Sequence, residues 1–190
     1  MIHQLFGLRR WTDCLNALAL VGVSGVLWFA FLWQIIFHDL PCPLCLLQRV
    51  AFTMVGVGLM LNVCFGSRPA HYGIAILSAL AGMVSSARQV LLHIAPGDAG
   101  YGMPFLGLHF YTWALIAFFL LALYLGGLLL LDGMKQTDAA DTPRSPGWLG
   151  NLGIYSFLVI LLVMFVATLL ECGLGPCPDD PTDYLWIPGK

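Results

Sequence analysis

Residues 17–37 read ALALVGVSGVLWFAFLWQIIF, an apolar run without a charged side chain. The hydrocarbon core of a bilayer is about 30 Å thick, and a helix of roughly 20 apolar residues crosses it. The run is longer than the apolar core of a secretory signal, and no small-residue cleavage site follows it. We therefore expect it to be a membrane anchor that the protein retains.

Four further stretches have the same length and character. They are residues 44–65, 73–94, 105–131 and 149–170, in which the few charged or titratable residues include Arg49, Arg88 and His109. The whole chain is 59% hydrophobic and 9% charged, whereas about a quarter of the residues of a soluble domain are charged. The sequence therefore predicts an all-α membrane protein with five transmembrane helices. The net charge of −2 argues against a nucleic-acid partner.

Basic residues indicate which side of the membrane each end occupies, because Lys and Arg accumulate in short cytoplasmic loops. Arg9 and Arg10 precede the first span, Arg68 follows the second, and Lys135 and Arg144 follow the fourth. These segments lie on one side if all five spans cross. We expect the amino terminus to be cytoplasmic and the carboxyl terminus to lie on the other side.

This topology sorts the cysteines. Cys42 and Cys45 follow one crossing, and Cys172 and Cys177 follow five, so both pairs fall on the outer face. Disulfides persist in that compartment and thiols stay reduced in the cytosol. The two remaining cysteines, at the inner ends of the first two spans, are interpreted as small apolar residues: Cys14 and Cys64.

The segment LPCPLCLLQR, residues 40–49, combines a C-x-x-C pair with a charged residue inside an apolar run. Cys45 falls near the start of the second span, where a helix N-terminus lowers a thiol pKa. Arg49 follows four residues later and shares its helical face. An intramembrane arginine is a functional candidate by default, and Gln48 adds an amide at the same level.

A dithiol that becomes oxidised in this place must pass two electrons to an acceptor. The sequence has no dinucleotide fingerprint, Walker loop or haem-attachment motif, which leaves a lipid-soluble quinone. Arg49, Arg88 and His93 are candidate donors to its carbonyl oxygens. Arg88 is equally well explained by reaching toward the headgroups, and His93 and His109 by a plain interfacial role.

Two other classes of function remain open. A membrane metal-binding protein would combine the four outer cysteines in a zinc site, although four residues rather than the usual two separate Cys172 from Cys177. A non-enzymatic scaffold would use its disulfides only to close outer loops. Four glycines within the spans are interpreted as points of close helix packing: Gly22, Gly25, Gly56 and Gly58.

Three segments carry a resemblance to a known family. PCPLCLLQR (41–49) resembles the first external loop of the bacterial disulfide-bond formation protein DsbB family, SSARQVLLHIAP (85–96) resembles the end of its third helix, and FLGLHFYTWALIAFF (105–119) resembles the entry to its fourth. The resemblance implies that residues 1–131 form a four-helix bundle in the bacterial inner membrane that binds ubiquinone or menaquinone.

The resemblance also implies roles for individual residues and a partner. Cys45 and Arg49 would serve the quinone, Cys42 would exchange with a second cysteine pair, and Arg88 matches a recurring arginine. The protein would reoxidise a periplasmic thioredoxin-like protein, DsbA or a relative.

The sequence departs from the family pattern in one respect. The family carries its second cysteine pair between the third and fourth helices, but residues 95–104 hold no cysteine. Here a cytoplasmic linker (132–148) leads to a fifth helix (149–170) and a periplasmic tail (171–190). We expect Cys172 and Cys177 in this tail to replace the missing pair and to pass electrons to Cys42 and Cys45.

Overall fold

The computed structural model describes residues 2–133, 146–178, 181 and 184–186. The described part contains five α-helices: α1 (Ile2–Phe37), α2 (Pro43–Phe65), α3 (Pro69–Leu92), α4 (Phe110–Gly133) and α5 (Gly147–Cys172). Each helix holds a segment long and apolar enough to cross a membrane. Among the described residues the only β pairing is an isolated bridge between Phe105 and Leu108. The predicted all-α membrane fold is confirmed.

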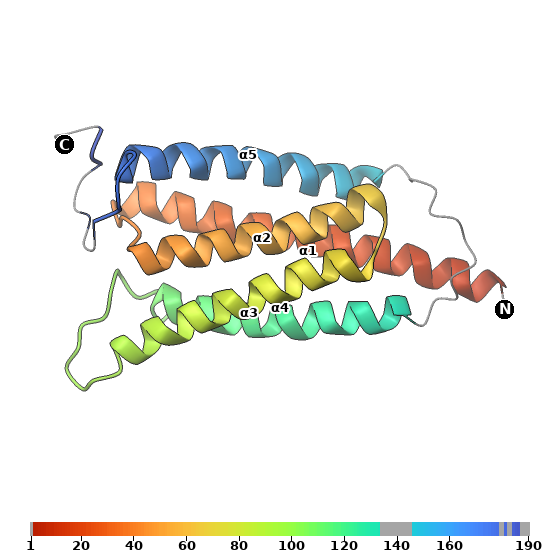
Figure 1. Ribbon diagram of the computed structural model, residues 1–190, viewed down its shortest axis with the longest axis horizontal. Coiled ribbons are helices and arrows are strands. Elements are labelled where there is room, and N and C mark those ends of the chain that lie inside the picture. Colours follow the sequence, from red (N-terminus) through yellow and green to blue (C-terminus); the bar gives the residue numbers. More distant parts are fainter. Residues whose placement is uncertain (1, 134–145, 179–180, 182–183, 187–190) are drawn as a thin grey trace.

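The helices run roughly parallel to one long axis (Figure 1). Packing follows the order α5, α1, α2, α3, α4, and α5 also touches α2, whereas α1 and α4 scarcely meet. Large apolar side chains fill the centre, with Phe52 of α2 stacked on Phe118 of α4 at 4.0 Å between ring centroids. The extra helix α5 therefore lies against the first two helices, and a seam is left between α1 and α4.

Two helix boundaries differ from the prediction in ways that affect the site. The fourth helix was expected from residue 105 but begins at Phe110, because residues 105–108 form a tight turn with Phe105 and Leu108 hydrogen-bonded to each other in both directions. Gly107 has a φ of 83°, a value that glycine adopts without strain. The fifth helix was expected to end at 170 but continues to Cys172, so this cysteine lies on the helix.

The glycine interpretation is right for two of four positions. A Cβ on Gly56 would collide with the Phe157 ring, and one on Gly58 would lie 2.7 Å from the His71 carbonyl oxygen. Gly22 and Gly25 have nothing within 4 Å of a Cβ. These two glycines on α1 face open space in the seam, so they are not packing points.

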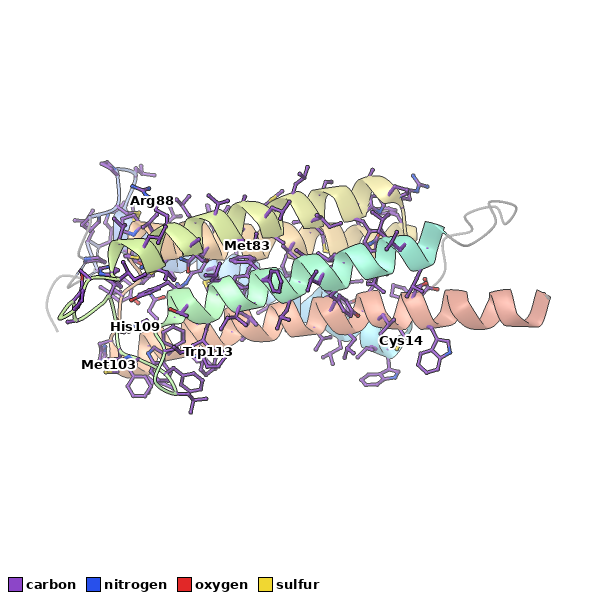
Figure 2. The ribbon with its side chains drawn as sticks, turned by 90° about the horizontal axis from the view of Figure 1, so that it is seen from below. Cys14, Met83, Arg88, Met103, His109 and Trp113 are labelled. Atoms are coloured by element: carbon purple, nitrogen blue, oxygen red, sulfur yellow. A yellow bond between two sulfur atoms is a disulfide. The ribbon has the colours of Figure 1, made fainter. Side chains whose placement is uncertain are left out.

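The connections gather at two ends. The segments 38–42 and 93–109 and the described residues after α5 (173–178, 181 and 184–186) lie together at what we term the cysteine end (Figure 1). Cys14 lies toward the opposite end from His109 and Met103 (Figure 2). The inner part of the linker, residues 134–145 with Lys135 and Arg144, lies outside the described residues.

Candidate functional site

The C-x-x-C pair forms the beginning of α2. Cys42 is the N-cap residue, in an extended conformation, and Pro43 is the first helical residue, a position that proline favours. The Cys45 backbone N–H donates to Cys42 Sγ at 3.1 Å. The sequence placed Cys45 at the helix start, but the structure gives the N-cap position to Cys42.

This geometry favours the thiolate form of Cys42. A hydrogen bond from the Cys45 side chain, with further bonds from the Cys45 backbone and from Gln89, lowers the pKa of Cys42 to about 6 against the opposing effect of burial. Both cysteines carry free thiols. Cys42 is therefore the thiol of the pair that is ionised at neutral pH.

A glutamine of α3 holds the pair from the other side. Gln89 Nε2 donates to Cys42 Sγ at 3.2 Å and lies 3.6 Å from Cys45 Sγ. Its Oε1 accepts a 2.8 Å hydrogen bond from Gln48 Nε2. Gln89 is only 1% exposed, so its amide is committed to this contact.

From the sequence, Arg88 rather than Gln89 was the predicted site residue on the third helix. Arg88 is exposed on α3 and does not line the site, since successive helical residues point about 100° apart. Figure 2 shows Arg88 near the cysteine end of α3. The sequence did contain an indication of Gln89, because an uncharged polar side chain is unusual in an apolar helix. The adjacent arginine was the stronger candidate by charge.

Arg49 bridges from α2 to α1. Its Nη1 donates to Gln34 Oε1 at 2.7 Å, and its Nη2 donates to the Ala30 carbonyl oxygen at 3.3 Å. Gln34 in turn donates from Nε2 to the Tyr184 hydroxyl in the tail at 3.0 Å. This hydrogen-bonded row connects the tail to the arginine, and sequence reasoning did not anticipate Gln34.

A cavity of about 530 Å³ lies in the seam between α1 and α4. Cys45, Gln48 and Arg49 line its polar side, whereas Cys42 does not reach it. The remaining wall is mostly aromatic and glycine, including Gly22, Gly25, Phe29, Trp33, Phe105, Phe110 and Trp113. The cavity is thus an apolar slot with one cysteine and one arginine at its side.

The short connection between α3 and α4 covers the cysteine end of this cavity. Tyr101 and Gly102 contribute to the wall. The Tyr101 hydroxyl donates to the Leu40 carbonyl oxygen at 2.8 Å, and the Met103 backbone N–H donates to Asp39 at 3.2 Å. These contacts hold the connection over the cavity at its cysteine end.

One polar group on the cavity wall has no partner. Trp33 Nε1 is buried, and among the described residues nothing accepts its hydrogen bond. A buried donor of this kind costs free energy unless a ligand or water satisfies it. Trp33 thus lines the cavity and carries a buried N–H without an acceptor among the described residues.

The two histidines form a separate group. His93 Nδ1 lies 3.1 Å from Asp98 Oδ1. The rings of His93 and His109 each stack on the Tyr111 ring, with centroids 5.6 and 5.2 Å away. The Gly100 backbone N–H, followed by His93, holds the pKa of the Asp98 carboxyl below its usual value. Neither histidine lines the cavity.

The second cysteine pair is oxidised. Cys172 and Cys177 form a disulfide at the end of α5, and the Trp186 backbone N–H donates to the Leu170 carbonyl oxygen, which folds the tail back over the helix end. Cys172 is 5% exposed and Cys177 is half-buried. Within the described part of the chain, no three His, Cys, Asp or Glu residues form a group that could hold a metal ion.

Known proteins similar to this chain include disulfide bond formation proteins of several bacteria. A family model described as disulfide bond formation protein DsbB matches residues 10–102. The disulfide bond formation protein B of Nitrosomonas eutropha is 30% identical over 79 residues, 40% of this chain and 49% of the relative. Disulfide bond formation protein B 2 of Burkholderia lata is 27% identical over 163 residues, 68% of this chain and 94% of the relative.

A third relative, the disulfide bond formation protein B of Xanthomonas axonopodis pv. citri, is 35% identical over 86 residues, 43% of this chain and 50% of the relative. The chain thus spans about half the length of two of these relatives and nearly all of the third. No solved structure matches it. The family match covers α1, α2, α3 and the C-x-x-C pair, and α5 lies beyond it. Over most of α1 and all of α2 and α3 the chain is similar to the DsbB family, and its second cysteine pair, after a fifth membrane helix, lies beyond the residues that the family model matches.

Proposed function

We propose that this membrane protein is a thiol oxidase that takes two electrons from a periplasmic thioredoxin-like dithiol protein and passes them to ubiquinone or menaquinone. The observation that carries the proposal is that Cys45 and Arg49 share the wall of one apolar cavity. The cavity lies where the backbones of α1 and α4 seldom approach each other, and this seam would let a lipid-soluble molecule enter from the bilayer once the aromatic side chains move aside.

The residues of the cavity fit a quinone. Its volume lies within the roughly 300–1,000 Å³ typical of ligand pockets, and its aromatic walls suit a planar ring. Trp33 Nε1 is a donor without an acceptor, and Arg49 and Gln48 add charged and amide donors. A bound quinone would supply the two-electron acceptor that the dithiol requires.

The two cysteines of the C-x-x-C pair have different roles in this proposal. Gln89 and the Cys45 backbone N–H stabilise the Cys42 thiolate, while Cys45 faces the cavity. Arg49 interacts electrostatically with Cys45 and is held in place by Gln34. Cys45 is thus the sulfur presented to an acceptor, and Cys42 is the sulfur presented to the second pair.

The tail disulfide is the entry point for electrons in this proposal. A partner thiolate attacks one sulfur of the Cys172–Cys177 bond and forms a mixed disulfide, which the second partner thiol resolves. Cys177 is the more exposed sulfur, so we assign the attack to it. The resulting tail dithiol then reduces an oxidised Cys42–Cys45 pair.

The location follows from the chemistry. A disulfide that cycles through partner proteins works in an oxidising compartment, and the positions of Arg and Lys assign the opposite face to the cytoplasm. We therefore place the protein in the bacterial inner membrane, with the cysteine end facing the periplasm.

The test uses purified protein, a short-chain quinone and either a reduced thioredoxin-like protein or a small dithiol as donor. Cys42→Ser and Cys45→Ser should abolish quinone reduction by both donors. Cys172→Ser and Cys177→Ser should abolish it with the protein donor only, and Cys64→Ser should leave it unchanged. Unchanged turnover in the tail variants would refute the relay. If the wild type failed to reduce quinone and instead retained metal that either cysteine pair is needed to hold, the metal-binding alternative would stand.

A further inference from the structure

Glu171 occupies the last turn of α5, immediately before Cys172. It is 2% exposed, and neither carboxyl oxygen has a hydrogen-bond partner among the described residues. A buried carboxyl group without a partner destabilises a fold, and the C-terminal end of a helix disfavours negative charge. Packing alone therefore gives no reason for an acid at this position.

The groups around Glu171 belong to the redox site. Arg49 of α2 and Cys42, the N-cap of α2, both interact electrostatically with its carboxyl group, and Tyr184 of the tail interacts with the same arginine. The Arg49 N–H groups are directed at Ala30 and Gln34 of α1, so they leave the carboxyl oxygens without a donor. Glu171 therefore adjoins one cysteine pair in sequence and interacts with a member of the other.

We propose that Glu171 is the acid–base group that carries protons between the two cysteine pairs while they exchange electrons. The inference rests on the proposed relay and adds a residue to it. Thiol–disulfide exchange requires a thiolate as the attacking group, and a thiol buried like Cys172 has little access to water as a base. The carboxylate next to it can accept the proton instead.

The step balances as follows. The Cys172 S–H bond breaks, its proton moves to the Glu171 carboxylate, and the Cys172 thiolate attacks Cys42 Sγ. A Cys172–Cys42 disulfide forms, and the Cys42–Cys45 bond breaks to leave a Cys45 thiolate, which takes the proton from Glu171.

In the second half, the Cys177 thiol passes its proton to Glu171 and attacks Cys172. The tail disulfide closes and Cys42 leaves as a thiolate, which Gln89 stabilises. Two electrons have moved from the tail pair to the C-x-x-C pair, and one proton has moved from Cys172 to Cys45. The proton from Cys177 is held by Glu171, and its release to water restores the carboxylate.

The kinetic test uses quinone-free protein with both pairs oxidised, mixed with the reduced protein partner and quenched with acid at successive times. Alkylation and mass spectrometry then report which pair is reduced. In the wild type, reduced tail should pass its electrons on without accumulating. In Glu171→Gln, reduced tail should accumulate, with exchange slowed by about 100-fold, in the range for loss of a general base, and with a steeper dependence on pH.

Two comparisons separate proton transfer from structure. Glu171→Asp keeps an acid and should restore most of the exchange rate, although it is shorter. Glu171→Gln keeps the shape and removes an unpaired charge, so it should fold at least as well as the wild type. The first reaction, between partner and tail, should be equally fast in all three proteins.

A readout independent of activity is available because Glu171 is the single glutamate of the sequence. Protein labelled with carboxyl-¹³C glutamate should show an isotope-shifted carboxylic acid C=O band in the infrared that changes when the tail pair is reduced. The band should be absent from Glu171→Gln.

Three results would overturn the inference: equal exchange rates and pH profiles in Glu171→Gln and wild type, equal losses in the Gln and Asp variants with an unchanged pH profile, or a labelled band that ignores the redox state. None of these results would contradict electron transfer from the tail pair to the C-x-x-C pair. The relay would instead fail if Cys172→Ser and Cys177→Ser supported normal turnover with the partner.

Discussion

Gln89 Nε2 donates a hydrogen bond to Cys42 Sγ at 3.2 Å, from the helix position next to the arginine that the sequence singles out. The contact joins α3 to the start of α2 and ties the amide of Gln48 into the same group. It adds to the hydrogen bonds from Cys45 that make Cys42 the better stabilised thiolate of the pair. The predictions below follow from this arrangement and from the cavity beside it.

The first prediction concerns pH. Because the pKa of Cys42 is lowered to about 6, chiefly by Cys45, its alkylation rate should stay high from neutral pH down to about 6 and then fall as the thiolate is protonated. A lowered pKa also stabilises the folded, reduced protein above the ordinary thiol pKa, and this stabilisation is lost as pH falls through about 6. Mass spectrometry of the Cys42 peptide measures the rate. Cys45→Ala should move the midpoint upward, and an unmoved midpoint would refute the pairing.

The second prediction compares neighbours on α3. Gln89→Leu removes a hydrogen bond to a charged group, worth about 1.5–3 kcal/mol, and should raise the midpoint of Cys42 alkylation by about one to two pH units. Arg88→Ala should leave the midpoint unchanged, because this side chain is exposed. The opposite ranking would restore Arg88 as the functional residue.

The third prediction concerns the donor on the cavity wall. Trp33→Phe keeps the ring but removes the N–H that has no partner, and losing one hydrogen bond of about 1 kcal/mol should raise KM for quinone about three- to tenfold. Trp28→Phe makes the same change on the same helix, at an N–H that bonds Ser156 instead, and should leave KM unchanged. Steady-state quinone reduction with a small dithiol distinguishes the two. Equal values of KM would show that the indole N–H faces no ligand.

The fourth prediction concerns the seam. Gly25→Leu places a side chain into the open space of the cavity and should abolish quinone reduction while the protein remains as stable as the wild type, since leucine is the better helix former. Gly126→Leu on α4 also meets nothing within 4 Å of its Cβ but lies outside the cavity lining, so it should be silent. Thermal unfolding checks stability in both variants. Normal turnover in Gly25→Leu would place the quinone elsewhere.

The membrane fold and the placement of the helices could be predicted from sequence, because hydrophobic length alone specifies a membrane span. The start of α4 could not, since Phe105, Leu106 and Leu108 are as apolar as the helix that follows. The chain turns there through the positive φ angles of Leu106 and Gly107, which the apolar pattern does not reveal. Apolar patterns do not distinguish a turn at the membrane edge from one more helical turn.

The site shows the same division. Cys42, Cys45 and Arg49 could be named because their spacing carries chemistry within one helix. Gln89 and Gln34 act across helices, and their roles depend on which face of α3 and α1 turns toward the cysteine pair. Gly22 and Gly25 lie in apolar helical segments just as Gly56 and Gly58 do. Only the neighbouring helix decides whether such a glycine makes a close contact or borders a cavity.

The central claim is that Cys45, on the wall of the seam, delivers electrons to a membrane quinone. Rapid mixing of the double variant Cys172→Ser/Cys177→Ser, with its Cys42–Cys45 pair reduced, against a short-chain quinone tests it directly through the quinone absorbance. The account predicts that one equivalent of quinone is reduced per protein, and that none is reduced when Cys45 is also replaced by serine. Reduction that persists without Cys45, or no reduction with both thiols present, would contradict it.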